Sequence, residues 1–167
     1  MERKIRMTTT FDTQIIVDTE VPLVRIQREF AASPQAVFEA HTDPVLFARW
    51  NGPRDSRMTV DHFDCRPGGS YRYTISRDGF EARFRGCFHD IRPGELIVQT
   101  FAFEGMPDGV ALEKLRFERI GDGHTLLTAT SLVDSFADRD AFVATGMETG
   151  VTEGYESLDA VLAERTH

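Results

Sequence analysis

The chain has 167 residues and a formal net charge of −8, with 41% hydrophobic and 28% charged residues. This length predicts one domain with a sizeable core, and the composition is typical of a globular protein. The acidic balance argues against nucleic-acid and anionic membrane partners, and no apolar run approaches the roughly 20 residues that span a bilayer.

The beginning of the chain carries the weakest pattern. Residues 14–17 are a candidate strand that Pro22 would interrupt, so residues 1–22 are interpreted as an N-terminal extension or an extra edge strand. Residues 23–167 are predicted to form the single domain, and its first strand covers about residues 24–31. The side chains on one face of this strand are Val24, Ile26, Arg28 and Phe30.

Two short helices are predicted directly after this first strand. A Ser-Pro pair at 33–34 supplies an N-cap and a proline at the first helical position, and the helix runs to about His41. An Asp-Pro pair at 43–44 repeats the signal for a second helix that contains Trp50. A Gly-Pro pair at 52–53 ends that helix.

Six further strands follow, separated by turn residues. Asp78-Gly79 stands between two alternating runs, which is a strong hairpin signal. Consecutive short connections of this kind predict an antiparallel meander. The strands are expected at about residues 57–65, 69–77, 81–91, 95–104, 111–120 and 124–132.

The last segment, from Asp138 to about Arg165, is predicted to be one long helix with Asp138 as its N-cap. An apolar stripe about 120° wide would face the sheet, and it consists of Val143, Met147, Val151, Tyr155, Leu158, Val161 and Leu162. Gly146, Gly150 and Gly154 recur at every fourth position. Because each glycine destabilises a helix by about 1 kcal/mol, they indicate close approach of another backbone or one wall of a cavity. We expect Gly154 to be a packing residue and Gly150 to lie at the stripe's edge.

These elements predict an α+β domain of two layers, in which a seven-stranded antiparallel sheet faces one long helix. Such a sheet curls, and one helix cannot fill its concave face, so phenylalanine side chains fill the remaining volume or a pocket stays open. Gln99 would lie among aromatic side chains and would need a hydrogen-bond partner if buried. The side chains predicted to line the pocket and bind a ligand are Trp50, Tyr71, Tyr73, Phe84, Gln99, Phe101, Phe103, Met147, Val151 and Tyr155.

Four blocks of the sequence resemble one branch of a known superfamily. They lie at residues 33–53, 64–72, 86–100 and 146–159, and they include the motifs RWNGP at 49–53, DCRPGGSYR at 64–72 and GMETGV at 146–151. Over about residues 24–163 the chain resembles the activator-of-heat-shock-protein-ATPase-like branch of the START-related superfamily. This superfamily is also called SRPBCC or polyketide cyclase-like.

The resemblance implies the helix-grip fold, in which a curved antiparallel sheet surrounds a long C-terminal helix with a hydrophobic cavity between them. It does not imply one function, because members of the superfamily include chaperone-ATPase activators, ligand carriers, polyketide cyclases and antibiotic self-resistance proteins. The resemblance also allows a homodimer. Asn51 stands where the family often has an aromatic residue after Trp50, which changes the polarity expected at the cavity mouth.

The sequence contains no recognisable catalytic, metal-binding or cofactor-binding motif. No two of the five histidines have metal-ligand spacing, and Cys65 and Cys87 are expected to be free thiols, as in a cytoplasmic protein. Two His–Asp combinations are candidates for an acid–base pair facing the cavity, although hydrogen-bonded or solvated edge pairs are the favoured interpretation. They are His62 with Asp64 and His89 with Asp90.

Three functions follow from this sequence. The main hypothesis is binding of a small hydrophobic or aromatic ligand without chemistry, and a core with no void would contradict it. The alternative is a cyclase-like or hydrolase-like enzyme in the same cavity, which requires a titratable group inside. The third is a chaperone-ATPase activator or other interaction module, which requires a partner face on the outside of the sheet.

Overall fold

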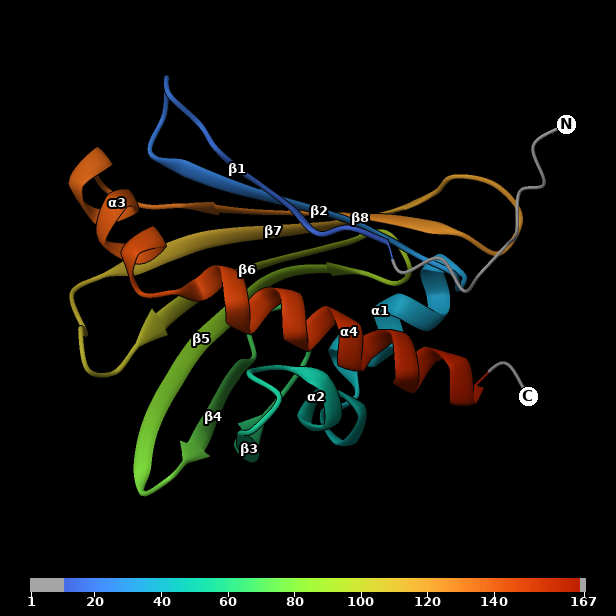
Figure 1. The fold of residues 1–167 in the computed structure, drawn as a ribbon, viewed down its shortest axis with the longest axis horizontal. Coiled ribbons are helices and arrows are strands. Elements are labelled where there is room, and N and C mark those ends of the chain that lie inside the picture. The colour runs from blue at the N-terminus through green and yellow to red at the C-terminus, as the bar shows by residue number, and fades with distance from the viewer. Residues whose placement is uncertain (1–10, 166–167) are drawn as a thin grey trace, which may run out of the picture.

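The computed structural model describes residues 11–165, which form one antiparallel sheet of eight strands and four helices (Figure 1). The strands are β1 (Gln14–Val17), β2 (Leu23–Phe30), β3 (Arg57–Phe63), β4 (Ser70–Arg77), β5 (Phe80–Arg92), β6 (Leu96–Phe103), β7 (Val110–Arg119) and β8 (Thr125–Leu132). The helices are α1 (Pro34–Thr42), α2 (Pro44–Trp50), α3 (Phe136–Ala144) and α4 (Met147–Arg165). In the described part of the chain, no helix is both long and apolar enough to span a membrane.

The strand order in the sheet is β1-β2-β8-β7-β6-β5-β4-β3, and all neighbours are antiparallel. Strands β3 to β8 form the predicted meander, with boundaries within two residues of those expected. Strand β2 then pairs with β8, at the far end of the meander. The strand count is eight rather than the predicted seven, because residues 14–17 pair with β2 and add an edge strand.

Helices α1 and α2 begin at the proline and capping residues that the sequence predicts. The Ser33 hydroxyl accepts a hydrogen bond from the Ala36 backbone N–H, and the Asp43 carboxylate accepts bonds from Val45 and Leu46. Asp43 therefore ends one helix and caps the next, which keeps the two helices short and places them in series.

The C-terminal helix is broken, which corrects the prediction of one continuous helix from Asp138. Helix α3 ends at Ala144, and Gly146 has φ of +81°, a left-handed conformation that glycine adopts without steric cost. The N-cap is Ser135, whose hydroxyl accepts the Asp138 backbone N–H. The apolar stripe is therefore divided, and Val143 on α3 is exposed.

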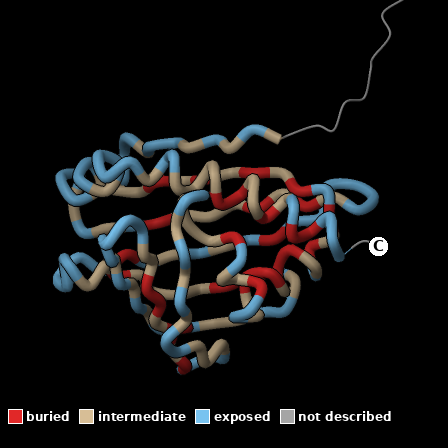
Figure 2. Tube along the Cα trace, turned by 60° about the horizontal axis from the view of Figure 1, so that its bottom comes forward, coloured by how far each residue is buried: buried red, intermediate tan, exposed pale blue. Residues whose placement is uncertain are grey.

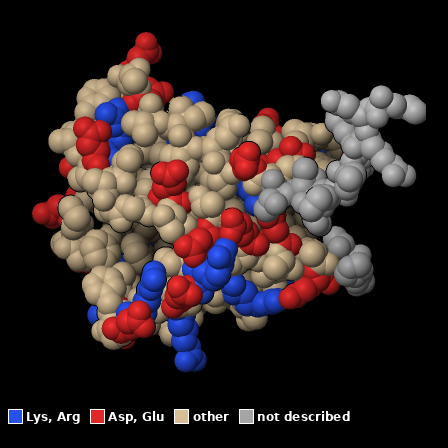
Figure 3. Space-filling model, in the orientation of Figure 1, with Lys and Arg blue, Asp and Glu red and all other residues tan. Residues whose placement is uncertain are grey.

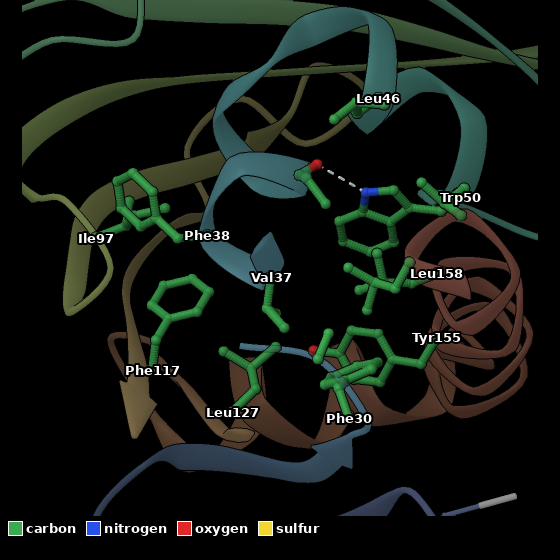
Figure 4. Packing of buried hydrophobic residues seen from close by; sticks show 14 of the residues in the cluster. Phe30, Val37, Phe38, Leu46, Trp50, Ile97, Phe117, Leu127, Tyr155 and Leu158 are labelled. Atoms are coloured by element: carbon green, nitrogen blue, oxygen red, sulfur yellow. Dashed lines mark hydrogen bonds between the residues drawn. The ribbon is translucent and has the colours of Figure 1, made fainter. Parts of the chain in front are cut away.

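The compact core lies at one end of the molecule, where α1, α2 and the second half of α4 cover the sheet. Figure 4 shows Phe30, Val37 and Leu127 facing Leu158 there, and each of these side chains is fully buried. The Trp50 indole N–H donates to the Ala40 carbonyl at 2.8 Å, which joins α2 to α1. Buried segments, red in Figure 2, gather toward this same end.

Arg28 links β2 to α4 inside this core. Its guanidinium is 1% exposed and donates to both carboxylate oxygens of Asp159, at 2.9 and 2.5 Å. The same group donates to the Glu29 carbonyl and lies over the Phe30 ring, with 4.8 Å between the guanidinium carbon and the ring centroid. A bidentate pair of this kind fixes both the position and the rotation of α4 over the sheet.

Candidate functional site

A cavity of about 830 Å³ lies between the inner face of the sheet and the first half of α4. Its lining includes residues of β4, β5 and the first half of α4, and Figure 1 shows that β4 and β5 curve away from this helix. All ten predicted binding residues line it, namely Trp50, Tyr71, Tyr73, Phe84, Gln99, Phe101, Phe103, Met147, Val151 and Tyr155. These side chains come from α2, from one shared inner face of β4, β5 and β6, and from α4.

A row of aromatic rings crosses three neighbouring strands on this inner face. Tyr73 on β4 stacks on Phe84 of β5 with ring centroids 5.3 Å apart, and Phe84 stacks on Phe101 of β6 at 5.4 Å. Tyr73 and Phe84 are direct partners in the strand register. Cross-strand aromatic pairs of this kind stabilise the sheet and give the cavity a rigid apolar floor.

Tyr71 lies along the sheet, and its polar end is already occupied. Its hydroxyl donates to the Thr100 carbonyl at 2.7 Å, across strand β5. The ring passes over Gly86, where a β-carbon would stand 2.6 Å from the ring and 2.0 Å from the Thr100 carbonyl oxygen. Gly86 therefore allows this close approach, and Tyr71 offers the cavity only apolar surface.

A polar group lies among the apolar side chains of the cavity floor, and its central residue was not predicted. The Gln99 side-chain amide donates to one carboxylate oxygen of Glu113 at 3.0 Å, and the Ser131 hydroxyl donates to the other at 2.8 Å. The three residues are direct register partners on β6, β7 and β8. The partner that Gln99 was expected to need is thus Glu113.

The cavity shifts the pKa values of Glu113 and of two tyrosines that line it. Burial raises the pKa of the Glu113 carboxyl, although the hydrogen bonds from Gln99 and Ser131 oppose that shift. Burial also raises the pKa of the Tyr73 and Tyr155 hydroxyls, and the negative charge of Glu113 adds to both shifts. Each of these tyrosines therefore remains a neutral hydrogen-bond donor near the carboxylate.

His41 is a second titratable side chain in the cavity lining. Its Nδ1 lies 2.8 Å from the Val37 carbonyl, and its Nε2 is buried without a hydrogen-bond partner. Burial lowers the pKa of the imidazole to about 4, so the ring is neutral at physiological pH. It packs between Trp50 and Phe117, and this neutral ring belongs to the core as much as to the cavity.

Helix α4 forms the opposite wall, and its glycines differ in their surroundings. A β-carbon on Gly154 would lie 3.2 Å from the Trp50 carbonyl oxygen and 3.4 Å from the Gly52 nitrogen, so α4 approaches the end of α2 closely. A β-carbon on Gly150 would meet only Pro53, at 3.8 Å, and Gly150 lines the cavity. The contact at Gly154 is with the backbone after α2, not with a strand.

The cavity mouth is framed by exposed apolar side chains from two hairpins. They are Phe80 at 66% exposure, Met106 at 60% and Val110 at 46%. Arg77, Asp134 and Asp138 also line the cavity. Figure 3 shows an uncharged area at this end with acidic and basic side chains above and below it, and further charged side chains gathered over α4 and α2.

The two predicted His–Asp combinations do not face this cavity. His62 is exposed and bonds to the Ser70 hydroxyl at 3.0 Å, and His89 is exposed as well. Their carboxylate neighbours bind adjacent arginines, Asp64 with Arg66 and Asp90 with Arg92. These pairs therefore lie on the solvent-facing surface of the sheet and not in the cavity. Among residues 11–165, no group of three or more His, Cys, Asp or Glu side chains is arranged to hold a metal ion.

The sequence carried a usable signal for Glu113. The apolar Leu115 and Phe117 lie on the inner face of β7, and strict alternation places Ala111 and Glu113 on that face too. A glutamate at such a position contradicts the apolar pattern, and this contradiction marks a functional candidate.

Comparisons with known proteins agree with this architecture. The Mycobacterium smegmatis protein Ms6760 is 22% identical, with a TM-score of 0.82 over 90% of this chain and 97% of its own. An Arthrobacter aurescens protein is 28% identical, with a TM-score of 0.82 over 90% of this chain and 91% of its own. A Rhodobacter sphaeroides protein is 26% identical, with a TM-score of 0.81 over 92% and 99%. No curated protein matches the chain.

The sequence pattern itself identifies the family. The family described as "Activator of Hsp90 ATPase homolog 1-like protein" matches residues 31–163, which is most of the chain. The matched region runs from the end of β2 to the last turns of α4 and includes every side chain of the Gln99–Glu113–Ser131 group. The chain therefore belongs to the activator of Hsp90 ATPase homolog 1-like family, with the helix-grip fold of the polyketide cyclase-like superfamily.

Proposed function

We propose that this protein binds a small hydrophobic or aromatic molecule in the cavity between the sheet and α4. The observation that carries the proposal is the cavity itself, at about 830 Å³ with a predominantly apolar and aromatic lining. Small-molecule sites commonly have volumes of roughly 300–1,000 Å³ and combine such a lining with a few convergent polar groups. The Gln99–Glu113–Ser131 group meets the second condition.

A fluorescence titration with N-phenylnaphthylamine, a neutral aromatic probe, tests this proposal. The protein should bind the probe saturably at one site. Val151→Trp places an indole in the cavity and should weaken binding at least about tenfold. Val143→Trp, on the exposed surface of α3, is the matched control and should leave binding unchanged.

Two outcomes would overturn the proposal. One is the absence of saturable binding by the wild-type protein. The other is undiminished binding by a Val151→Trp variant whose thermal melting shows that it is folded.

A cyclase-like or hydrolase-like enzyme is the second candidate, and Glu113 is the observation that favours it. The carboxyl group lies in the cavity and its pKa is raised by burial, as in many general acids. Both of its oxygens already accept hydrogen bonds, one from Gln99 and one from Ser131. Neither donor belongs to a nucleophile–base pair, so binding is the better supported function. Mass spectrometry of a ligand that copurifies with the protein separates the two, since a mass change on incubation that Glu113→Gln abolishes would favour the enzyme.

The remaining expectations stay predictions. A cytoplasmic location is supported by the free thiols of Cys65 and Cys87. Light scattering would test the homodimer. A pull-down that recovers a chaperone would favour the activator function that the family description suggests.

A further inference from the structure

We infer that the ligand is a hydrophobic amine, and that its protonated nitrogen pairs with the Glu113 carboxylate on the floor of the cavity. This inference rests on the proposed binding function and adds the chemical class of the ligand.

The contacts of Glu113 are those of an ionised acceptor. Gln99 donates to one oxygen and Ser131 to the other, and hydrogen bonds from donors favour the charged form of a carboxyl group. An ionised carboxylate has about four acceptor sites, and these two bonds use one site on each oxygen. Each oxygen therefore retains capacity for a donor in the cavity.

Glu113 has no positively charged partner among residues 11–165. Among the described residues, no arginine, lysine or histidine forms an ion pair with it, although Arg72, Arg83 and Arg92 on β4 and β5 each pair with an acidic residue. Glu113 is half-buried in a predominantly apolar cavity, where a charge is unfavourable unless it is paired. The missing positive charge is what a ligand ammonium group would supply.

The cavity lining as a whole favours a cation. Among the described lining residues, three carry a carboxylate, namely Glu113, Asp134 and Asp138, and one is an arginine or lysine, namely Arg77. His41 adds no positive charge, because its imidazole is buried and neutral. An anionic ligand would therefore meet net repulsion, and a neutral one would forgo the charge-assisted bond, which is roughly twice as strong as a neutral hydrogen bond.

The rest of the lining defines the remainder of the ligand. The stacked row of Tyr73, Phe84 and Phe101 offers apolar surface, and the Tyr71 hydroxyl is occupied by Thr100. The amine should therefore carry a flat or bulky hydrocarbon body, with its polar group at one end.

Three fluorescent probes with one hydrocarbon body test the inference. They are pyrenemethylamine, pyrenemethanol and pyrenecarboxylic acid, and at about pH 7.5 the amine is protonated and the acid ionised. The wild-type protein should bind the amine at least about tenfold more tightly than the alcohol, and the acid most weakly. Glu113→Gln should reduce the affinity for the amine to that for the alcohol, and change the affinity for the alcohol little. Glu118→Gln, on the outer face of the same strand, is the matched control and should not alter amine binding.

The possible results separate the two proposals. If the alcohol or the acid binds as tightly as the amine, and Val151→Trp blocks that binding, the cavity binds ligands but the inference is wrong. An amine advantage that survives in folded Glu113→Gln also overturns it. If none of the three probes binds, the proposed function itself fails. The ranking of the probes on the wild-type protein decides the inference even if Glu113→Gln does not fold.

Discussion

At the scale of single residues, the charge on Glu113 that would pair with a cationic ligand is unfavourable for the stability of the free protein. Burial raises the pKa of its carboxyl, so the folded protein holds this proton at a higher pH than the unfolded chain does. The contribution of Glu113 to stability is therefore best at acidic pH and is lost as pH rises through the pKa of the folded state. Ionised Glu113 destabilises the free protein, which is the usual consequence of a functional charge in an apolar site.

This balance predicts a stabilised variant. Glu113→Gln keeps the size of the side chain and one acceptor oxygen for Gln99, and its amide can donate to the Ser131 hydroxyl, but it removes the charge. The variant should melt at a higher temperature than the wild-type protein at pH 8, and the difference should shrink at pH 5. Calorimetry at the two pH values measures this, and a variant that melts lower than wild type at pH 8 would contradict it.

His41 predicts the opposite pH dependence. Burial lowers the pKa of its imidazole to about 4, from 6.5 in the unfolded chain, so between these values the unfolded state binds more protons. Stability is thus complete above pH 6.5 and falls as the pH drops toward 4, by about 3 kcal/mol from this residue.

Urea unfolding at pH 7 and pH 4 measures this effect. His41→Leu should lose much of the difference between the two pH values. The exposed His89 provides the control, since His89→Asn should retain the wild-type difference. Equal pH dependence in wild type and His41→Leu would show that His41 does not titrate as its burial requires.

At the scale of elements, the break between α3 and α4 shows why repeated glycines are ambiguous in sequence. Gly146, Gly150 and Gly154 have the same spacing but three different roles: a left-handed helix end, a place on the cavity wall, and a close contact with the backbone after α2. Spacing alone cannot separate these roles, because they depend on backbone conformation and on what lies opposite.

The last two glycines give a paired prediction. Gly154→Ala should destabilise the protein by about 1–3 kcal/mol, because the added methyl group meets backbone atoms that cannot move aside. Gly150→Ala meets ordinary contact distances and gains helix propensity, so it should be neutral or stabilising by up to about 1 kcal/mol. Thermal melts of the two single variants measure the order, and a more damaging Gly150→Ala would contradict the position of α4 over α2.

At the scale of the whole molecule, the Arg28–Asp159 pair joins the first long strand to the last helix. Asp159→Asn would leave the Arg28 guanidinium buried with a neutral partner. Because Asp159 is 33% exposed and water reaches it, the loss should be about 2–4 kcal/mol, somewhat below that for a fully buried pair. Glu164→Gln breaks the exposed pair with Arg49 and should change stability by less than about 1 kcal/mol. Chemical denaturation compares the two variants, and equal effects would show that the buried pair has no special importance.

Most of the architecture could be predicted from local signals. Turn dipeptides such as Asp78-Gly79 mark the ends of strands, and the caps at Ser33 and Asp43 mark the starts of helices. The cavity residues followed from alternation combined with the family resemblance. The Glu113 contacts could not be predicted with the same certainty, because they depend on the register between β6, β7 and β8, and register is a property of paired strands rather than of one segment.

The pairing of β2 with β8 also has a kinetic consequence. Leu23 pairs with Leu132 and Phe30 with Thr125, so the sheet joins segments about a hundred residues apart in the chain. Folding rates fall as contacts become less local, because a long loop must be closed before such pairs form. During synthesis, the apolar face of β2 leaves the ribosome long before its β8 partner is made. The nascent chain is therefore exposed to misassociation over most of its translation, and the final closure of the sheet waits for β8.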